Sequence, residues 1–189
     1  MVRAARLLAL VIVVFSVACS EPPNKEMNLA QGAIDTARAA GAERFAADEL
    51  TAAGDALKRS NDAAAGNDYR QALSHALDSF ERAQNAAKLA VESRANARGE
   101  AERAVAQVAT LLTTAEGRLK SSPLPARNLK APQQALRAAE GSLQKARAAL
   151  ATEDYLAVEP ALKGVAADIE AAMVQIDARP AAAPNRRKR

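Results

Sequence analysis

Few residues of this chain belong to the types that carry out chemistry. The sequence holds one cysteine, Cys19, and one histidine, His75. A histidine base needs a partner that orients it, and none is evident, so we expect His75 to be solvated or at an edge. No His, Cys or carboxylate residues have metal-site spacing, and Gly99 and Gly117 are too isolated to form a phosphate-binding loop. We therefore expect no enzyme, no metal and no cofactor.

Cys19 ends the most apolar segment of the chain. The start, "MVRAARLLALVIVVFSVACS", has a basic head with Arg3 and Arg6, an apolar core at 7–15, and small or modest residues before the cysteine. This is the layout of a secretory signal peptide. A membrane-spanning helix needs about 20 apolar residues, more than this core provides. We predict that residues 1–18 are a signal peptide and that the chain is exported.

The four residues Ser16-Val17-Ala18-Cys19 resemble a lipobox, the bacterial signal at which a cysteine is diacylated and becomes the first residue of the mature chain. Ser16 stands where the motif usually has Leu. The resemblance implies that Cys19 is lipidated. The alternative is an ordinary cleaved signal with a cysteine nearby, although a single cysteine in an exported chain has no internal disulfide partner.

Lipidation would tie the chain to a membrane, because two acyl chains give stable anchoring. In relatives of this kind, Asp after the cysteine retains the protein in the inner membrane. Ser20 therefore implies the outer membrane, facing the periplasm, with the periplasmic face of the inner membrane as the alternative. Residues 19–28 are polar with paired prolines and are predicted to be a semi-rigid tether.

The composition predicts helices that pack closely. Alanine supplies 50 of the 189 residues, and Phe and Tyr together supply five. Alanine is the best helix former and allows short distances between helix axes. A thick globular core would need larger side chains. We therefore predict an all-α fold, an elongated antiparallel helical bundle with coiled-coil-like hairpins.

The positive charge lies mainly at the two ends. The formal net charge of the chain is +4. The C-terminal run carries as many positive charges as this net value, on Arg186, Arg187, Lys188 and Arg189. The body is not basic, so we expect no nucleic-acid partner. The last residues, 179–189, are predicted to be a disordered basic tail. They could bind peptidoglycan carboxylates or anionic lipids, or simply keep the chain soluble.

Apolar spacing, Gly and Pro set the predicted elements. The predicted helices cover residues 27–40, 46–65, 69–119, 132–151 and 155–176. In the long third helix the apolar stripe thins around Gly99, where a bend would fit, and Pro160 is expected to kink the last helix. The last helix also has a strict heptad, formed by Tyr155, Val158, Leu162, Val165, Ile169, Ala172 and Ile176.

These elements define the predicted organisation of the chain. After the tether come a first helical hairpin region with the long helix (29–119), a Pro-rich connection (120–131), a second helical hairpin (132–178) and the tail. The hairpins resemble each other at an offset of 86 residues, at which Asp68-Tyr69 aligns with Asp154-Tyr155 and Leu50 with Leu136. We predict an internal duplication. The alternative is chance similarity in an alanine-rich chain.

The stretch from Ala33 to Ala87 resembles a family of alanine-rich helical domains of unknown function in Gram-negative envelope lipoproteins. The matching features are an Ala-rich first helix, Phe45-Ala46 followed by Leu50, the Asn67-Asp68-Tyr69 turn and an alanine ladder. Ala47 replaces the proline of the family pattern. Some relatives also carry an OmpA-type domain, which this sequence does not show. The resemblance implies an envelope location and no defined activity.

Two functions remain open. The first is a non-enzymatic lipoprotein that acts as a helical spacer or adaptor in the bacterial envelope, with a second copy or an envelope protein as partner. The second is a tetratricopeptide-like module for peptides or proteins, or a periplasmic chaperone, since paired helices form grooves. An offset of 86 residues is far from the tetratricopeptide period of about 34 residues.

Overall fold

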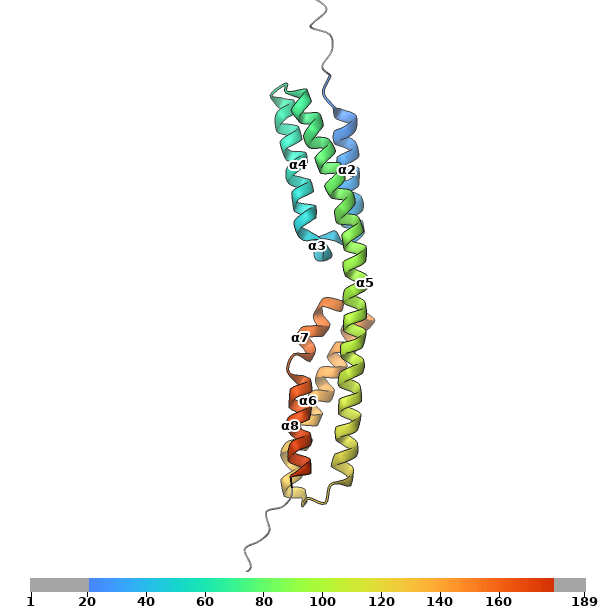
Figure 1. The fold of residues 1–189 in the computed structure, drawn as a ribbon, viewed down its shortest axis with the longest axis vertical. Coiled ribbons are helices and arrows are strands. Elements are labelled where there is room, and N and C mark those ends of the chain that lie inside the picture. Colours follow the sequence, from blue (N-terminus) through green and yellow to red (C-terminus); the bar gives the residue numbers. More distant parts are fainter. Residues whose placement is uncertain (1–20, 179–189) are drawn as a thin grey trace, which may run out of the picture. The chain divides into compact units, whose positions relative to one another are not determined.

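The computed structural model describes residues 21–178, and these form helices joined by short turns, without a strand (Figure 1). Neighbouring helices run antiparallel. The all-α prediction is therefore confirmed. The predicted signal peptide with Cys19, and the tail with Arg186, Arg187, Lys188 and Arg189, lie outside the described residues. The chain forms two compact units that divide between Ser93 and Arg94.

The first unit is built from α2 (Asn24–Ala39), the short α3 (Ala42–Phe45), α4 (Ala47–Ala65) and the first part of α5 (Tyr69–Ser121). Gly41 lies between α2 and α3 and has a φ of 88°, which glycine adopts at little cost. Helix α3 contacts both α2 and α4. The core holds mainly alanine, with a few larger residues: Ile34, Leu50 and Leu57.

Small buried residues line the contact between α4 and α5. Ala53, Ala56, Ala72 and Ala76 have no exposed surface. Alanine side chains let two helix backbones come close enough for a serine hydroxyl to reach across. Ser60 Oγ donates to the Ala72 carbonyl on α5 at 2.7 Å, and Ser79 Oγ donates to the Ala53 carbonyl on α4 at 2.8 Å. The hairpin is thus held by two buried hydrogen bonds of opposite direction.

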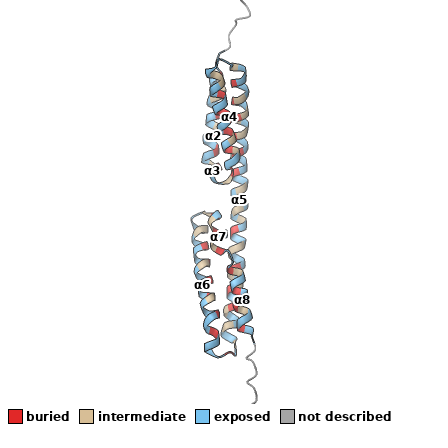
Figure 2. Cartoon of the chain, turned by 90° about the vertical axis from the view of Figure 1, so that its left-hand side faces the viewer, coloured by how far each residue is buried: buried red, intermediate tan, exposed pale blue. Residues whose placement is uncertain are grey.

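The second unit contains the rest of α5, α6 (Ala126–Ala151), the 3-10 turn η1 (Tyr155–Ala157), α7 (Val158–Leu162) and α8 (Val165–Asp177). Helix α6 contacts both α7 and α8. This core has larger side chains, and Val158 and Ile169 are completely buried. Buried residues lie on the facing sides of the helices in both units (Figure 2).

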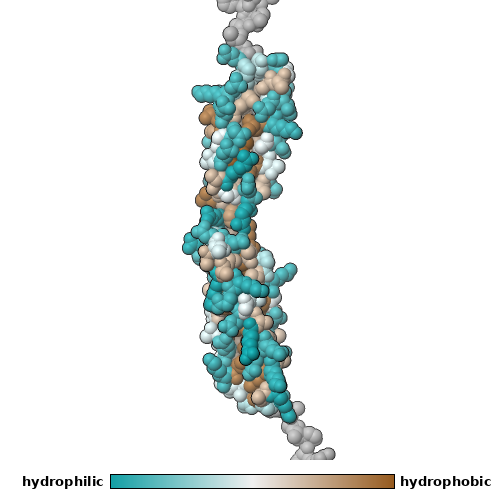
Figure 3. Space-filling model, turned by 180° about the vertical axis from the view of Figure 1, so that it is seen from behind, coloured by the Kyte–Doolittle hydropathy of each residue, from teal (hydrophilic) through white to brown (hydrophobic). Residues whose placement is uncertain are grey.

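Buried positions recur at alternating steps of three and four residues, as expected for helices with one buried face. In the first unit they are Ala46, just before α4, and Leu50, Ala53, Leu57 and Ser60 within α4. In the second unit they are Val158 and Leu162 in α7, and Val165, Ile169, Ala172 and Ile176 in α8. The heptad positions predicted for the last helix are therefore buried. Hydrophilic residues cover much of the face seen in Figure 3.

The two turns around the Asp-Tyr pairs have the same backbone hydrogen bonds. In the first, the Asp68 N–H donates to the Ala63 carbonyl at 2.9 Å; in the second, the Asp154 N–H donates to the Ala149 carbonyl at 2.8 Å. The preceding residues, Asn67 and Glu153, both have φ of 58°. This left-handed residue and the six-to-one bond are the features of a Schellman turn, which ends a helix.

The tyrosines of these turns differ. Tyr69 is half-buried and its hydroxyl donates to Asn67 Oδ1 at 2.8 Å, while Tyr155 is 8% exposed. The left-handed backbone of Asn67 places its amide oxygen within reach of the Tyr69 hydroxyl.

Helix α6 begins at Ala126, so the connection is shorter than predicted and Pro132 lies inside the helix rather than at its start. A proline inside a helix removes one N–H donor. Here the Pro132 side chain is fully buried, so packing of the ring offsets that loss. The connection also begins later than predicted, because α5 runs through Gly99 to Ser121 without interruption.

The break in the last predicted helix lies at Lys163-Gly164, four residues after Pro160. Gly164 has φ of 79°, which no helical residue adopts, and it separates α7 from α8. Pro160 itself stays inside α7. Glycine is the residue that takes this backbone conformation at little cost, so Gly164 places the break.

Candidate functional site

Cys19, the residue predicted to be lipidated, lies outside the described residues. In the segment that follows, Pro23 is buried at the start of α2. The Pro23 carbonyl accepts a hydrogen bond from the Met27 N–H at 3.0 Å. Of the predicted tether, 19–28, the part from Asn24 onward is already helical, because proline is well suited to precede or begin a helix.

His75 lies on α5 as a half-buried residue beside the fully buried Ala76. It has no hydrogen-bond or ion-pair partner among residues 21–178. A general base needs a group that fixes its orientation. The structure gives His75 the edge position that the sequence indicated.

Acidic side chains are spread over the helix surfaces. Within residues 21–178, no group of three or more His, Cys, Asp or Glu side chains is arranged to hold a metal ion. Asp68, which the sequence placed at a turn, accepts a hydrogen bond at Oδ1 from the Gln71 N–H at 3.0 Å. That bond caps the first turn of α5, so Asp68 has a structural role.

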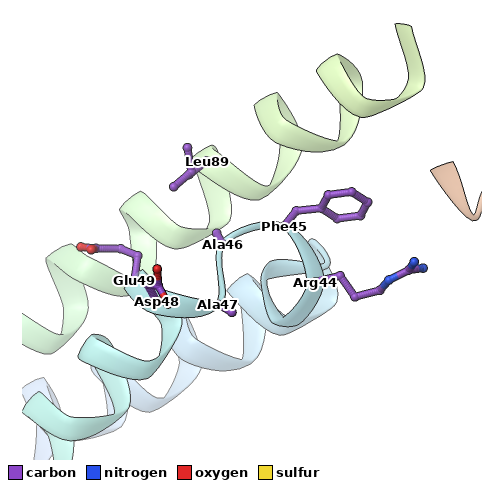
Figure 4. A pocket seen from close by; sticks show the side chains of 7 residues that line it. All are labelled: Arg44, Phe45, Ala46, Ala47, Asp48, Glu49 and Leu89. Carbon is purple, nitrogen blue, oxygen red and sulfur yellow. The ribbon is translucent and has the colours of Figure 1, made fainter. Parts of the chain in front are cut away.

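The hollow drawn in Figure 4 lies where α3 meets α4 in the first unit. Its volume is about 320 Å³, and its lining includes Phe45, Glu49 and Leu89. The Arg44 guanidinium lies 5.7 Å from the centre of the Phe45 ring, a distance typical of a cation–π contact. The lining brings no nucleophile and base together.

The second unit has a larger groove, of about 670 Å³, between α5 and the η1–α7 segment. Small residues line the α5 side, among them Ala101 and Ala104, and larger apolar ones line the opposite side, among them Val158 and Leu162. Glu100, Gln107, Glu159 and Lys163 provide its polar groups. The sequence alone does not indicate this groove, because its alanines have the same spacing as alanines that pack between helices.

A smaller hollow of about 340 Å³ lies beside Tyr155 and is bordered by Arg98 and Glu102. Arg98 Nε donates to Glu102 Oε1 at 2.7 Å. This hydrogen bond, together with the charge of Glu102, raises the pKa of the Arg98 guanidinium above its ordinary value. Both side chains are well exposed, so water screens the pair and its contribution to stability is small.

Of the helices in the described part of the chain, none combines the length and the apolar character that a membrane crossing requires. Comparison with known proteins gives no relative: no protein-family model, no curated protein and no solved structure matches this chain. The resemblance to alanine-rich envelope domains therefore remains a prediction from residues 33–87.

Proposed function

We propose that this chain is a non-enzymatic lipoprotein of the bacterial cell envelope, anchored through Cys19 and acting as a helical spacer or adaptor. The observation that carries the proposal is the apolar run 7–15 ending at Ser16-Val17-Ala18-Cys19. The run has the length of a signal peptide core, and the cysteine stands where a lipobox would have it. Ser20 favours the outer membrane.

Mass spectrometry of the mature protein from Gram-negative cells tests the anchor. We expect the N-terminal peptide to begin at Cys19 with acyl chains on the thiol, and the protein to fractionate with membranes. Cys19→Ser should abolish both, while Ser16→Ala, which changes the same motif but keeps the thiol, should retain both. A mature chain that starts after Cys19, or an unmodified thiol in the soluble fraction, would overturn the anchored-lipoprotein proposal.

A second experiment tests the membrane. Ser20→Asp should move the lipidated protein from the outer to the inner membrane fraction, whereas Ser20→Thr should leave it in place. If both variants distribute equally between the two membranes, residue 20 does not determine the membrane. The proposal of an anchor at Cys19 would not be affected.

We also propose that the two units arose by duplication. Supporting this, buried residues of the first unit align at the 86-residue offset with buried residues of the second: Leu50 with Leu136, Leu57 with Leu143, Ala72 with Val158, and Ala83 with Ile169. The backbone hydrogen bonds donated by the Asp68 and Asp154 N–H groups are also related by an offset of 86 residues. The alternating steps of three and four further favour coiled-coil-like, knobs-into-holes packing.

The groove of the second unit favours one alternative, a module that binds a peptide or protein. Its volume falls in the range of binding sites, and its lining is mainly apolar with a few polar groups. Small-angle scattering separates the two functions, because a spacer requires an extended particle in solution. A compact particle would favour the binding module.

A further inference from the structure

Helix α6 has an outer face of uniform charge. Arg127, Lys130, Arg137 and Lys145 are all exposed. With 3.6 residues per turn they lie along one side of the helix, opposite the buried line that includes Leu129, Leu136 and Leu143. We call these four residues the α6 basic face. The outer side of α6 is coloured as exposed in Figure 2.

Within residues 21–178 the cations of this face have no acidic partners. Some arginines elsewhere in these residues are paired, namely Arg59 with Asp78, Arg94 with Glu153, and Arg118 with Asp177. None of the four residues of the α6 basic face forms an ion pair or a side-chain hydrogen bond within residues 21–178. Their charge is therefore available to a partner.

The charge of α6 is also one-sided along its length. Its single acidic residue, Glu140, lies on the flank of the helix, between the buried line and the α6 basic face and three residues after Arg137. Arg147 lies on that same flank. Between the four cations stand small or uncharged residues, among them Gln134, Ala138 and Gly141, each exposed.

The shape of this face restricts the partner. Gly141 has open space around it, and alanines flank the cations. On this face of α6, only the cations and the glutamines have long side chains. No aromatic residue is present in α6 to stack on bases. No large apolar residue points outward to insert among acyl chains. A flat row of cations with these properties suits a flat anionic surface.

We propose that the α6 basic face docks the second unit on the surface of a bilayer containing anionic phospholipids. Each Lys or Arg held near such a surface increases binding by roughly fivefold. The contact is electrostatic, so it weakens as salt rises. It does not require lipidation of Cys19 and can fail or succeed independently of the anchor.

The test measures cosedimentation of the full chain carrying Cys19→Ser, which cannot be lipidated at that position. Two vesicle types are used at low salt: phosphatidylcholine alone, and phosphatidylcholine with phosphatidylglycerol. The apolar N-terminal run contributes to both types, so the ratio of the two partition coefficients reports the electrostatic contact. One variant changes Arg127, Lys130, Arg137 and Lys145 to Gln.

A matched control removes the same number of charges from scattered exposed positions, namely Lys58, Arg70, Lys88 and Lys163, also changed to Gln. We expect the ratio to fall roughly tenfold or more for the α6 variant and less than threefold for the control. Circular dichroism verifies that both variants remain helical. Equal falls in the two variants would overturn the proposal, because net charge alone would then explain binding.

The same variants are tested with purified sacculi to separate lipid from a polymeric anion. We expect the α6 variant to lose vesicle binding. We expect sacculus binding to change by the same amount in the α6 variant and in the control. If the α6 variant loses sacculus binding while its vesicle ratio stays at that of the control, the α6 basic face binds peptidoglycan and the lipid proposal is wrong.

Discussion

At the scale of single residues, the contact between α4 and α5 depends on side chains that are small or polar. Ser60 and Ser79 are completely buried, and each donates a hydrogen bond to a backbone carbonyl of the opposite helix. A buried hydroxyl without a partner would cost free energy. The hydroxyls thus favour the one register in which both carbonyls are within reach.

Ser60→Ala should lower the free energy of unfolding by about 1 kcal/mol relative to Ser74→Ala, measured by urea denaturation. Ser74 lies on the exposed side of α5. Both variants replace a helical serine with alanine, so helix propensity rises equally in the two. The difference between their free energies of unfolding therefore reports the buried hydrogen bond. If the two variants are equally stable, the hydroxyl of Ser60 does not contribute net stability.

Ala76 has no exposed surface, and its counterpart in the second unit at the 86-residue offset is Leu162. Leucine at position 76 would have to push α4 and α5 apart. Ala76→Leu should therefore lower the free energy of unfolding by roughly 1–3 kcal/mol. Leu77→Ala, at a neighbouring position that is 52% exposed, should change it by less than about 0.5 kcal/mol. A neutral Ala76→Leu would contradict close packing of this contact.

At the scale of elements, backbone conformation decides where helices end. Gly164 separates α7 from α8 with φ of 79°, whereas Gly141 lies inside α6 and has helical neighbours. An added Cβ meets no atom within 4 Å at either position. Differences between substitutions at these two glycines therefore come from the backbone alone.

Gly164→Ala should destabilise the protein by about 1 kcal/mol, because an L-residue in the left-handed region is strained. Gly141→Ala should stabilise it by roughly 0.5–1 kcal/mol, because alanine favours the helix. Thermal unfolding followed by circular dichroism measures both. Effects of the same sign would show that the break at Gly164 does not persist in solution.

At the scale of the whole molecule, each unit has its own buried core. The first contains mainly alanines with Ile34 and Leu50, and the second contains larger residues such as Val158 and Ile169. Helix α5 contributes residues to both units. Damage to one core should therefore loosen one unit before the other.

Ile169→Ala, at a position without exposed surface, should cost about 2–5 kcal/mol. Hydrogen exchange should then show the largest loss of protection in α6, α8 and the second part of α5, with α4 less affected. Val174→Ala, at a residue 72% exposed, serves as the control. Uniform loss of protection along the chain would mean that the two units unfold together.

The sequence by itself determined the all-α fold, the helix ends near residues 40 and 65, the turns at Asp68 and Asp154, and the heptad positions of the last helix. These features follow from local propensity and periodicity, which act over a few residues. The predicted lipidation of Cys19 also comes from the sequence, since it depends on a linear motif.

Only the tertiary structure decided how proline, serine and charge are used. Pro132 stays inside α6 because the surrounding core buries its ring, and Ser60 and Ser79 become hydrogen-bond donors because alanines let α4 and α5 approach. The α6 basic face likewise emerges only when the opposite side of the helix is buried and the ion pairs are known. Each of these depends on residues distant in the chain, which local patterns do not specify.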